Sequence, residues 1–134
     1  LESRPADPAM ERHPMIVAGF GFRSGATLDA LRDALERAGG PAGVTHLATL
    51  AAKAKGLEPL GHALALPVLA LTPDALRNQQ TLTQSDRVEA LFGTGSVAEA
   101  AALAAAGQDA SLRGPRAISA DGTATAAIAV GVAR

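Results

Sequence analysis

The sequence predicts an α/β protein in which a mixed β-sheet lies between two layers of helices and closes with a C-terminal β-hairpin. Three observations predict this three-layer α/β/α fold. Short apolar runs typical of buried strands alternate with amphipathic segments typical of helices, and Gly or Pro marks most of their boundaries. Near the C-terminus, two strand-like segments flank Asp121-Gly122, a dipeptide that favours a tight hairpin turn. Alternating strands and helices favour parallel pairing, whereas the hairpin adds an antiparallel strand, so we expect a mixed sheet.

The length and composition fit one globular domain over residues 15–134. The chain has 134 residues, of which 48% are hydrophobic, which is enough to bury a core without disulfides. Residues 1–14 are polar, contain several prolines and show no periodicity. We therefore expect them to form an arm that is disordered or foreign to the native chain, and they lack the apolar core of a secretory signal.

The first strand and helix are predicted on either side of a glycine cluster. Residues Met15–Phe20 form a short apolar run, typical of a buried strand. Residues Thr27–Ala38 place leucines at helical spacing with charged residues mostly on the other faces. Gly39-Gly40-Pro41 then ends this predicted helix.

The middle of the chain predicts a second strand, a helix and a third strand. The strands are Val44–Leu50 and Val68–Leu71, and the helix lies near Glu58–Leu64. Thr72-Pro73-Asp74 predicts the start of another short helix, because Pro is well suited to the first helical position.

The last third contains one ambiguous segment, one clear helix and the hairpin. Residues Thr81–Phe92 fit a helix or a strand, and the pattern does not decide between them. Ser96 and Glu99 have the spacing of a capping box at the start of an alanine-rich helix that runs to Ala106. The hairpin strands are expected at 116–120 and 123–130.

Composition excludes several classes of function. Twelve Lys and Arg nearly balance 13 Asp and Glu, so the chain has no basic surface for nucleic acid or acidic membranes. It has no Trp or Tyr on which bases could stack, and no Cys for disulfides or thiolate metal sites. The three His show no metal-ligand spacing. We therefore expect a cytoplasmic protein with a small-molecule ligand and with no metal, cofactor, nucleic-acid or membrane partner.

The glycine cluster after the first strand is the first candidate ligand site. A glycine-rich turn that leads into a helix lets the backbone approach an anion, and an Arg adds donors that suit a carboxylate. The candidate ligand-binding residues here are Gly19, Gly21, Arg23 and Ser24. The spacing is G-x-G-x-x-x-G, which differs from the dinucleotide fingerprint, and the Lys-Ser/Thr pair of a P-loop is absent. The alternative interpretation is a tight turn followed by a capped helix.

The second candidate site precedes the alanine-rich helix and comprises Gly93, Thr94, Gly95 and Ser96. A capping box alone would also explain Ser96, but not the two glycines around Thr94. If both glycine junctions face one crevice, two helix N-termini would suit a polyanion.

A third candidate is Lys53, which follows the second strand together with Glu58. Ligands of open α/β sheets usually bind at the carboxyl edge of the strands, where Lys53 is expected to lie. The alternative interpretation is an ordinary solvated lysine. No catalytic residue is predicted outright, because no nucleophile elbow or acid–base pair is evident.

The order of these motifs resembles the cobalamin-biosynthesis family that contains CobE and the C-terminal domain of CbiG. The resemblance runs from about Met15 to the end, and its most specific element is T-G-S-V-A-E-A-A-A-L from Thr94 to Leu103. Phe22 stands where the family often has a cysteine, and the spacing from Lys53 to Glu58 departs from the family's K-x-x-E.

The resemblance implies that the protein binds a precorrin or corrinoid intermediate, as a carrier or auxiliary factor of the aerobic pathway. One alternative that it implies is a lactone hydrolase of the cobalt-precorrin-5A hydrolase type. In that case Lys53 would stabilise an oxyanion and Glu99 would be the candidate base. A second alternative is a structural partner of another pathway enzyme.

Overall fold

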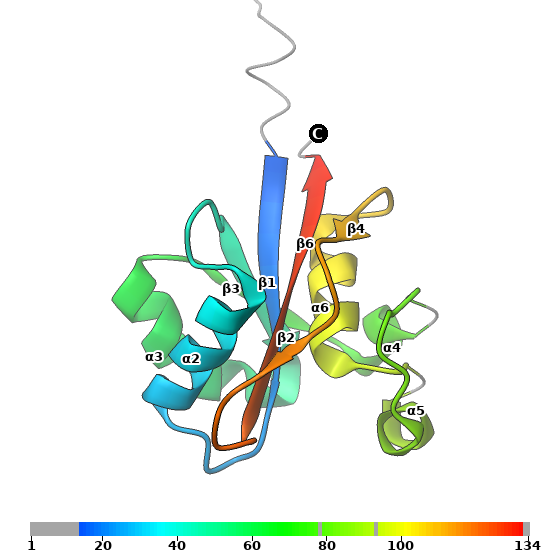
Figure 1. The fold of residues 1–134 in the computed structure, drawn as a ribbon. Helices are drawn as coiled ribbons and strands as arrows, with labels where there is room; N and C mark the ends of the chain where they lie inside the picture. Colours follow the sequence, from blue (N-terminus) through cyan, green and yellow to red (C-terminus); the bar gives the residue numbers. More distant parts are fainter. Residues whose placement is uncertain (1–13, 78, 93, 133–134) are drawn as a thin grey trace, which may run out of the picture.

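The computed structural model describes residues 14–77, 79–92 and 94–132. They form a six-stranded mixed sheet with helices on both faces, which confirms the predicted architecture (Figure 1). The strand order is β3-β2-β1-β6-β4, and β5 also pairs with β6. In chain order the elements are β1 (Pro14–Phe22), α2 (Leu28–Ala38), β2 (His46–Leu50), the 3₁₀ helix η1 (Ala51–Lys53), α3 (Ala54–Leu64), β3 (Val68–Leu71), α4 (Pro73–Leu76), α5 (Asp86–Phe92), α6 (Val97–Ala106), β4 (Ser111–Leu112), β5 (Ala117–Ile118) and β6 (Ala124–Val132).

Strands β1, β2 and β3 run parallel, so their carboxyl ends lie at one edge of the sheet. Strand β6 pairs antiparallel with the whole of β1, from Pro14 opposite Val132 to Phe22 opposite Ala124. Strand β5 pairs antiparallel with β6 across the Asp121-Gly122 turn, which confirms the predicted C-terminal hairpin. The helix-connected half is therefore parallel and the hairpin half antiparallel, as the sequence pattern indicates.

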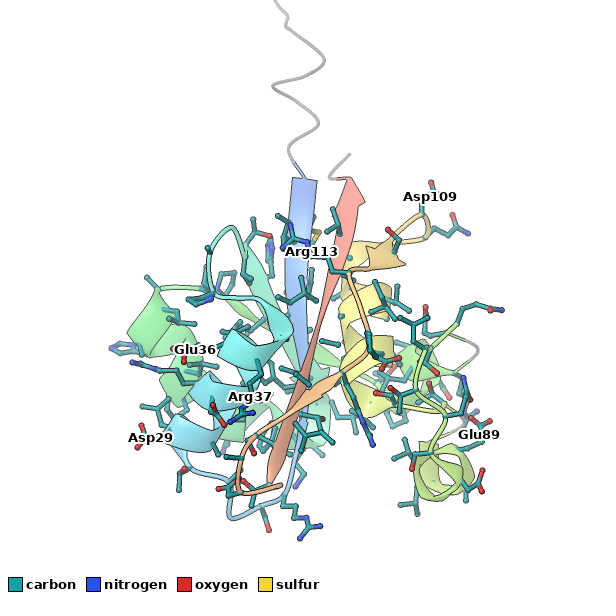
Figure 2. All side chains as sticks on the ribbon, viewed as in Figure 1. Asp29, Glu36, Arg37, Glu89, Asp109 and Arg113 are labelled. Atoms are coloured by element: carbon teal, nitrogen blue, oxygen red, sulfur yellow. The ribbon has the colours of Figure 1, made fainter. Side chains whose placement is uncertain are left out.

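The two faces of the sheet bury different side chains. The face under α2 and α3 holds large residues, among them Phe20, Leu35, Leu57 and Ile128. The face under α6 holds mainly alanines of the helix against small strand residues such as Ala48. On the outer side of α2, Asp29, Glu36 and Arg37 point away from the sheet (Figure 2). Helix α2 is thus amphipathic as predicted, whereas α6 is buried along most of its length.

Two strand glycines explain how α6 lies so close to the sheet. A Cβ at Gly19 would overlap the Ala98 carbonyl oxygen and would lie 2.5 Å from the Ala102 nitrogen. A Cβ at Gly131 would overlap the Ala106 carbonyl oxygen in the same way. The helix backbone therefore rests directly on the backbone of β1 and β6, which no other residue type would allow at these positions.

Several boundaries differ from those expected. Strand β1 already begins at Pro14, within the predicted arm 1–14, and the rest of that arm is outside the described residues. Strand β2 begins at His46 rather than Val44. Helix α3 begins at Ala54 rather than near Glu58, with Pro59 inside it, because η1 leads directly into it and Leu57 and Leu60 are both buried against the core.

The ambiguous segment 81–92 is irregular in its first part and helical only in α5. Among the described residues, no helix is long and apolar enough to cross a membrane.

Candidate functional site

The candidate residues converge on the carboxyl edge of the parallel strands, the lower edge in Figure 1. Strand β1 runs into the loop before α2, β2 runs into η1, and α6 begins at the same edge. A Cβ at Gly21 would lie 3.4 Å from Val97 Cβ, so the end of β1 touches the first turn of α6. The glycine motif of β1 and the start of the alanine-rich helix are therefore neighbours at the edge where such folds bind ligands.

The loop between β1 and α2 presents Arg23 and Ser24 to solvent. Its backbone is held by two hydrogen bonds, from Arg23 N to Thr123 O at 2.9 Å and from Ala26 N to Arg23 O at 2.9 Å. Thr27 caps α2 by accepting a hydrogen bond from Ala30 N at 3.1 Å. One of these backbone hydrogen bonds lies within the loop and the other joins it to Thr123, just before β6, so both candidate side chains project from an ordered backbone.

Lys53 is held at this edge by the ring of Phe22, a residue for which the sequence pattern predicts no role. The Lys53 Nζ lies 5.6 Å from the centroid of the Phe22 ring, within the range of a cation–π contact. The Phe22 ring in turn packs closely on Gly56, where a Cβ would lie 2.7 Å from Phe22 Cε2. Lys53 is half-buried rather than freely solvated, and it stands beside the strand end that carries Arg23.

The junction before α6 is covered by the segment 79–85. A Cβ at Gly95 would lie 2.7 Å from Gln84 Oε1 and 2.8 Å from Thr81 Oγ1. Ser85 N donates to Gly95 O at 2.9 Å. Close packing of this segment therefore requires glycine at position 95, and Gly93 lies outside the described residues.

The structure differs from the expected capping box at Glu99. Ser96 Oγ does accept from Glu99 N at 3.3 Å, which confirms half of the motif. The Glu99 carboxylate points instead to two other segments, accepting from Leu82 N at 2.6 Å, Thr83 N at 2.9 Å and Arg116 N at 2.8 Å, and also from Thr83 Oγ1. The side chain is fully buried, so Glu99 ties both segments to α6, and this arrangement favours a structural role.

Six of the predicted residues thus separate into two groups. Gly21, Arg23 and Lys53 lie together at the carboxyl edge beside the start of α6. Gly19, Ser96 and Glu99 are buried in contacts with the protein itself. The structure gives Gly19 the packing role described above.

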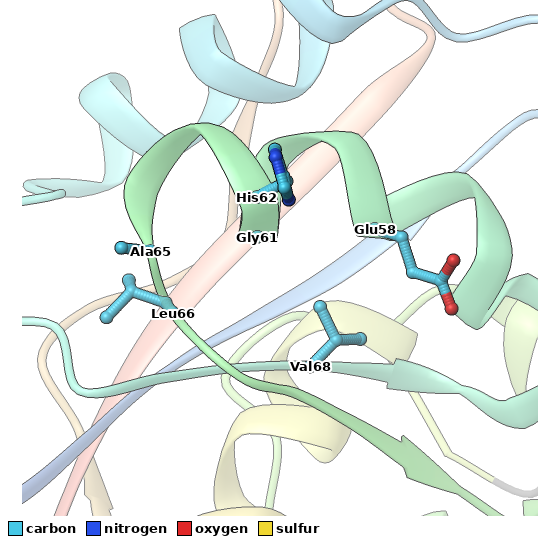
Figure 3. Close-up of a pocket in the computed structure, with 6 residues that line it drawn as sticks. All are labelled: Glu58, Gly61, His62, Ala65, Leu66 and Val68. Carbon is cyan, nitrogen blue, oxygen red and sulfur yellow. The ribbon is translucent and has the colours of Figure 1, made fainter.

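Glu58 lies apart from these residues, on the exposed side of α3. With His62 and Val68 it lines a cavity of about 600 Å³ between α3 and β3 (Figure 3). The side chains of Glu58 and His62 point in different directions (Figure 3). Among the described residues, no group of three or more His, Asp or Glu side chains could hold a metal ion.

The sequence profile of the family "Cobalamin synthesis G C-terminus" matches residues 16–129. The chain belongs to this cobalamin-biosynthesis family. Its structure is similar to that of CobE, a protein from the cobalamin (vitamin B12) biosynthetic pathway, with 34% identity and a TM-score of 0.75 over 87% of this chain and 90% of that one.

The chain is also similar to the cobalamin biosynthesis protein ChiG of Agrobacterium tumefaciens str. C58. This pair shares 34% identity with a TM-score of 0.62, over 87% of this chain and 98% of the other. A putative cobalamin biosynthesis protein G homolog of Sulfolobus solfataricus has the same fold at 19% identity and a TM-score of 0.64, and the match spans 36% of that longer chain. A search of curated proteins gave no match.

Proposed function

We propose that the protein binds a precorrin or corrinoid intermediate of cobalamin biosynthesis at the carboxyl edge of β1 and β2. The observation that carries this proposal is the position of Lys53, held over the Phe22 ring beside the Arg23 loop and the start of α6. The membership of the chain in a cobalamin-biosynthesis family supports the choice of ligand class.

The chemistry of this edge suits such a ligand. Precorrins are large rings fringed with acetate and propionate groups. Arg23 can meet a carboxylate with two parallel hydrogen bonds, and Lys53 can supply a point charge. Val97, the first residue of α6, contacts the end of β1, so the positive end of the α6 dipole lies close to the same edge. The fringe of one ring can therefore reach three sources of positive potential at one edge.

We favour a carrier role of the protein over a role as a hydrolase of a ring lactone. A hydrolase would need a base that is free to take up a proton, and Glu99 was the candidate. Both of its carboxylate oxygens already accept hydrogen bonds in a fully buried position. A base held in this way could not reach a ligand without breaking the contacts that order two segments, so a carrier or auxiliary role fits better.

The test is a calorimetric titration of the full chain with hydrogenobyrinic acid, with the visible spectrum followed in parallel. Lys53→Ala should weaken binding about 10- to 100-fold, the range expected for loss of one charge-assisted hydrogen bond. Lys55→Ala is the matched control, because Lys55 is an exposed lysine of the adjoining helix and should leave the affinity unchanged.

Equal affinity of the wild-type chain and Lys53→Ala would overturn the placement of the ligand at this edge. A complete lack of binding, with formation of a stable complex with another pathway enzyme, would support the structural-partner alternative. Turnover of a precorrin lactone that disappears in Lys53→Ala, while this variant still binds the lactone, would support the hydrolase.

A further inference from the structure

A second, polar cavity lies next to the proposed corrinoid edge, between the segment 79–84, helix α5 and the start of α6. Its volume is about 360 Å³, enough for a short side chain of a ligand. The described residues of its wall are Gly95 and six polar residues: Gln79, Gln80, Thr81, Gln84, Glu89 and Thr94. Gly95 lies two residues before Val97, the residue that touches the end of β1, so the cavity adjoins the carboxyl edge.

Thr94 contributes a buried hydroxyl that no described residue satisfies. The residue is only 2% exposed, and its Oγ1 has no hydrogen-bond partner in the described part of the chain. Buried hydroxyls are almost always hydrogen-bonded, because leaving one unpaired is unfavourable. Since Thr94 forms part of the cavity wall, a polar group bound in the cavity can supply the missing partner.

Several other polar groups of the wall offer acceptor oxygens. Gln79 Nε2 donates to Ala75 O at 3.2 Å, and Gln84 Nε2 donates to Thr81 O at 2.9 Å. These contacts identify the remaining atom of each amide as a carbonyl oxygen, and Glu89 adds a carboxylate that can only accept when ionised.

The wall therefore disfavours a carboxylate ligand. None of the described residues of the wall is a Lys, Arg or His, and a carboxylate would meet the carbonyl and carboxylate oxygens of these residues. A primary carboxamide fits better, because its two N–H donors match the acceptors and its carbonyl oxygen can accept from the Thr94 hydroxyl.

We infer that this cavity binds a primary carboxamide on the periphery of the ligand. The inference rests on the proposed function and deepens it, because it specifies the ligand as a corrinoid that carries carboxamide as well as carboxylate groups. The carboxylates meet Arg23 and Lys53 at the carboxyl edge, and the carboxamide enters the cavity beside Thr94.

The first test uses small probes and does not depend on corrinoid binding. ¹⁵N-labelled full-length chain is titrated with propionamide and, separately, with propionate, and backbone amide shifts are recorded by NMR. Propionamide should shift Thr94 and Gly95 saturably, whereas propionate should leave them unchanged at the same concentration. Thr94→Val should weaken the propionamide response about fivefold, the expected effect of one hydrogen bond, and Thr94→Ser should restore it.

The second test compares hydrogenobyrinic acid with a derivative in which two carboxylates are primary carboxamides. The derivative should bind the wild-type chain about fivefold more tightly, and Thr94→Val should abolish only this preference. Lys53→Ala should weaken both ligands.

The outcomes separate the two proposals. Equal binding of both corrinoids, together with no propionamide shift at Thr94, would overturn the carboxamide site while Lys53-dependent binding upheld the proposed function. Saturable propionamide shifts without binding of either corrinoid would uphold the carboxamide site and overturn the corrinoid assignment.

Discussion

The two glycine junctions of this protein look alike in sequence but are used differently in the structure. At the first junction, Gly19 and Gly21 lie at the end of β1 against α6, and the loop that follows leaves Arg23 and Ser24 exposed. At the second, Gly95 lies beneath the segment 79–85, which covers the start of α6. The first junction therefore presents its side chains to solvent, whereas the second is covered by another segment of the chain.

The difference shows that glycine at such a junction can serve packing and ligand access together. Gly19 is required by the helix that lies on it, whereas the adjacent exposed loop offers donors to a ligand. At the second junction the same close packing leaves a polar cavity, and the Thr94 hydroxyl in its wall has no hydrogen-bond partner among the described residues. A glycine-rich motif thus marks a close approach of two segments, and the residues around it decide whether a ligand takes part.

The strongest challenge to this comparison is Gly19→Ala. The added methyl group would overlap the backbone of α6, so we expect a loss of about 3 kcal/mol or more in the free energy of unfolding. Urea denaturation measures it. Gly25→Ala is the matched control, because a Cβ there meets nothing within 4 Å. Equal stability of the two variants would refute the packing role of Gly19.

The packing of segment 79–85 over the second junction is tested by Glu99→Gln. The amide NH₂ of Gln would face backbone N–H donors in a fully buried position, which should lower the free energy of unfolding by about 2–4 kcal/mol. Urea denaturation and hydrogen exchange at Leu82 and Thr83 measure it. Glu58→Gln, at an exposed position, should change stability by less than about 0.5 kcal/mol. A stable Glu99→Gln variant with unchanged hydrogen-exchange protection at Leu82 would show that the Glu99 carboxylate does not hold segment 79–85 on α6.

Much of the frame around these junctions could be predicted from the sequence, because it depends on local patterns. The hairpin at Asp121-Gly122, the cap at Thr72 and the end of α6 at Gly107 follow from turn and capping preferences. The carboxylate of Glu99 could not be placed, since its partners at 82–83 and 116 are about 17 residues away in the chain on either side.

The candidate site shows the same limit. Arg23 and Lys53 could be proposed from their places after two strands, because parallel strands end at a common edge. The contact of Lys53 with Phe22 could not be predicted, because it joins residues at the ends of two different strands. It also depends on the close packing of the Phe22 ring on Gly56. The Thr94 cavity also depends on tertiary contacts with a segment whose structure the sequence pattern left ambiguous.

A smaller effect concerns the turn that supports the first junction. Asp121 accepts from Ser119 Oγ at 2.7 Å and from Thr123 N at 3.0 Å, and Thr123 O receives the Arg23 N–H. These hydrogen bonds, led by that from Ser119, lower the pKa of Asp121 below its ordinary value of 3.8.

A carboxyl with a lowered pKa stabilises the folded state above the pKa of the unfolded chain, and this contribution is lost as pH falls through the folded pKa. Thermal unfolding between pH 7 and pH 2 should therefore show a steeper loss of stability below about pH 4 in the wild-type chain than in Asp121→Asn. Identical acid profiles for the two proteins would show that this turn does not depend on the charge of Asp121.

The position of the corrinoid at the carboxyl edge can be measured by NMR, by mapping the binding of hydrogenobyrinic acid on the ¹⁵N-labelled chain. We expect saturable shifts at Gly21, Arg23, Lys53 and the first turn of α6, with no more than small changes around Glu58 and His62 at the α3–β3 cavity (Figure 3). Shifts confined to that α3–β3 cavity, or none at all at saturating ligand, would contradict the assignment of the carboxyl edge as the corrinoid site.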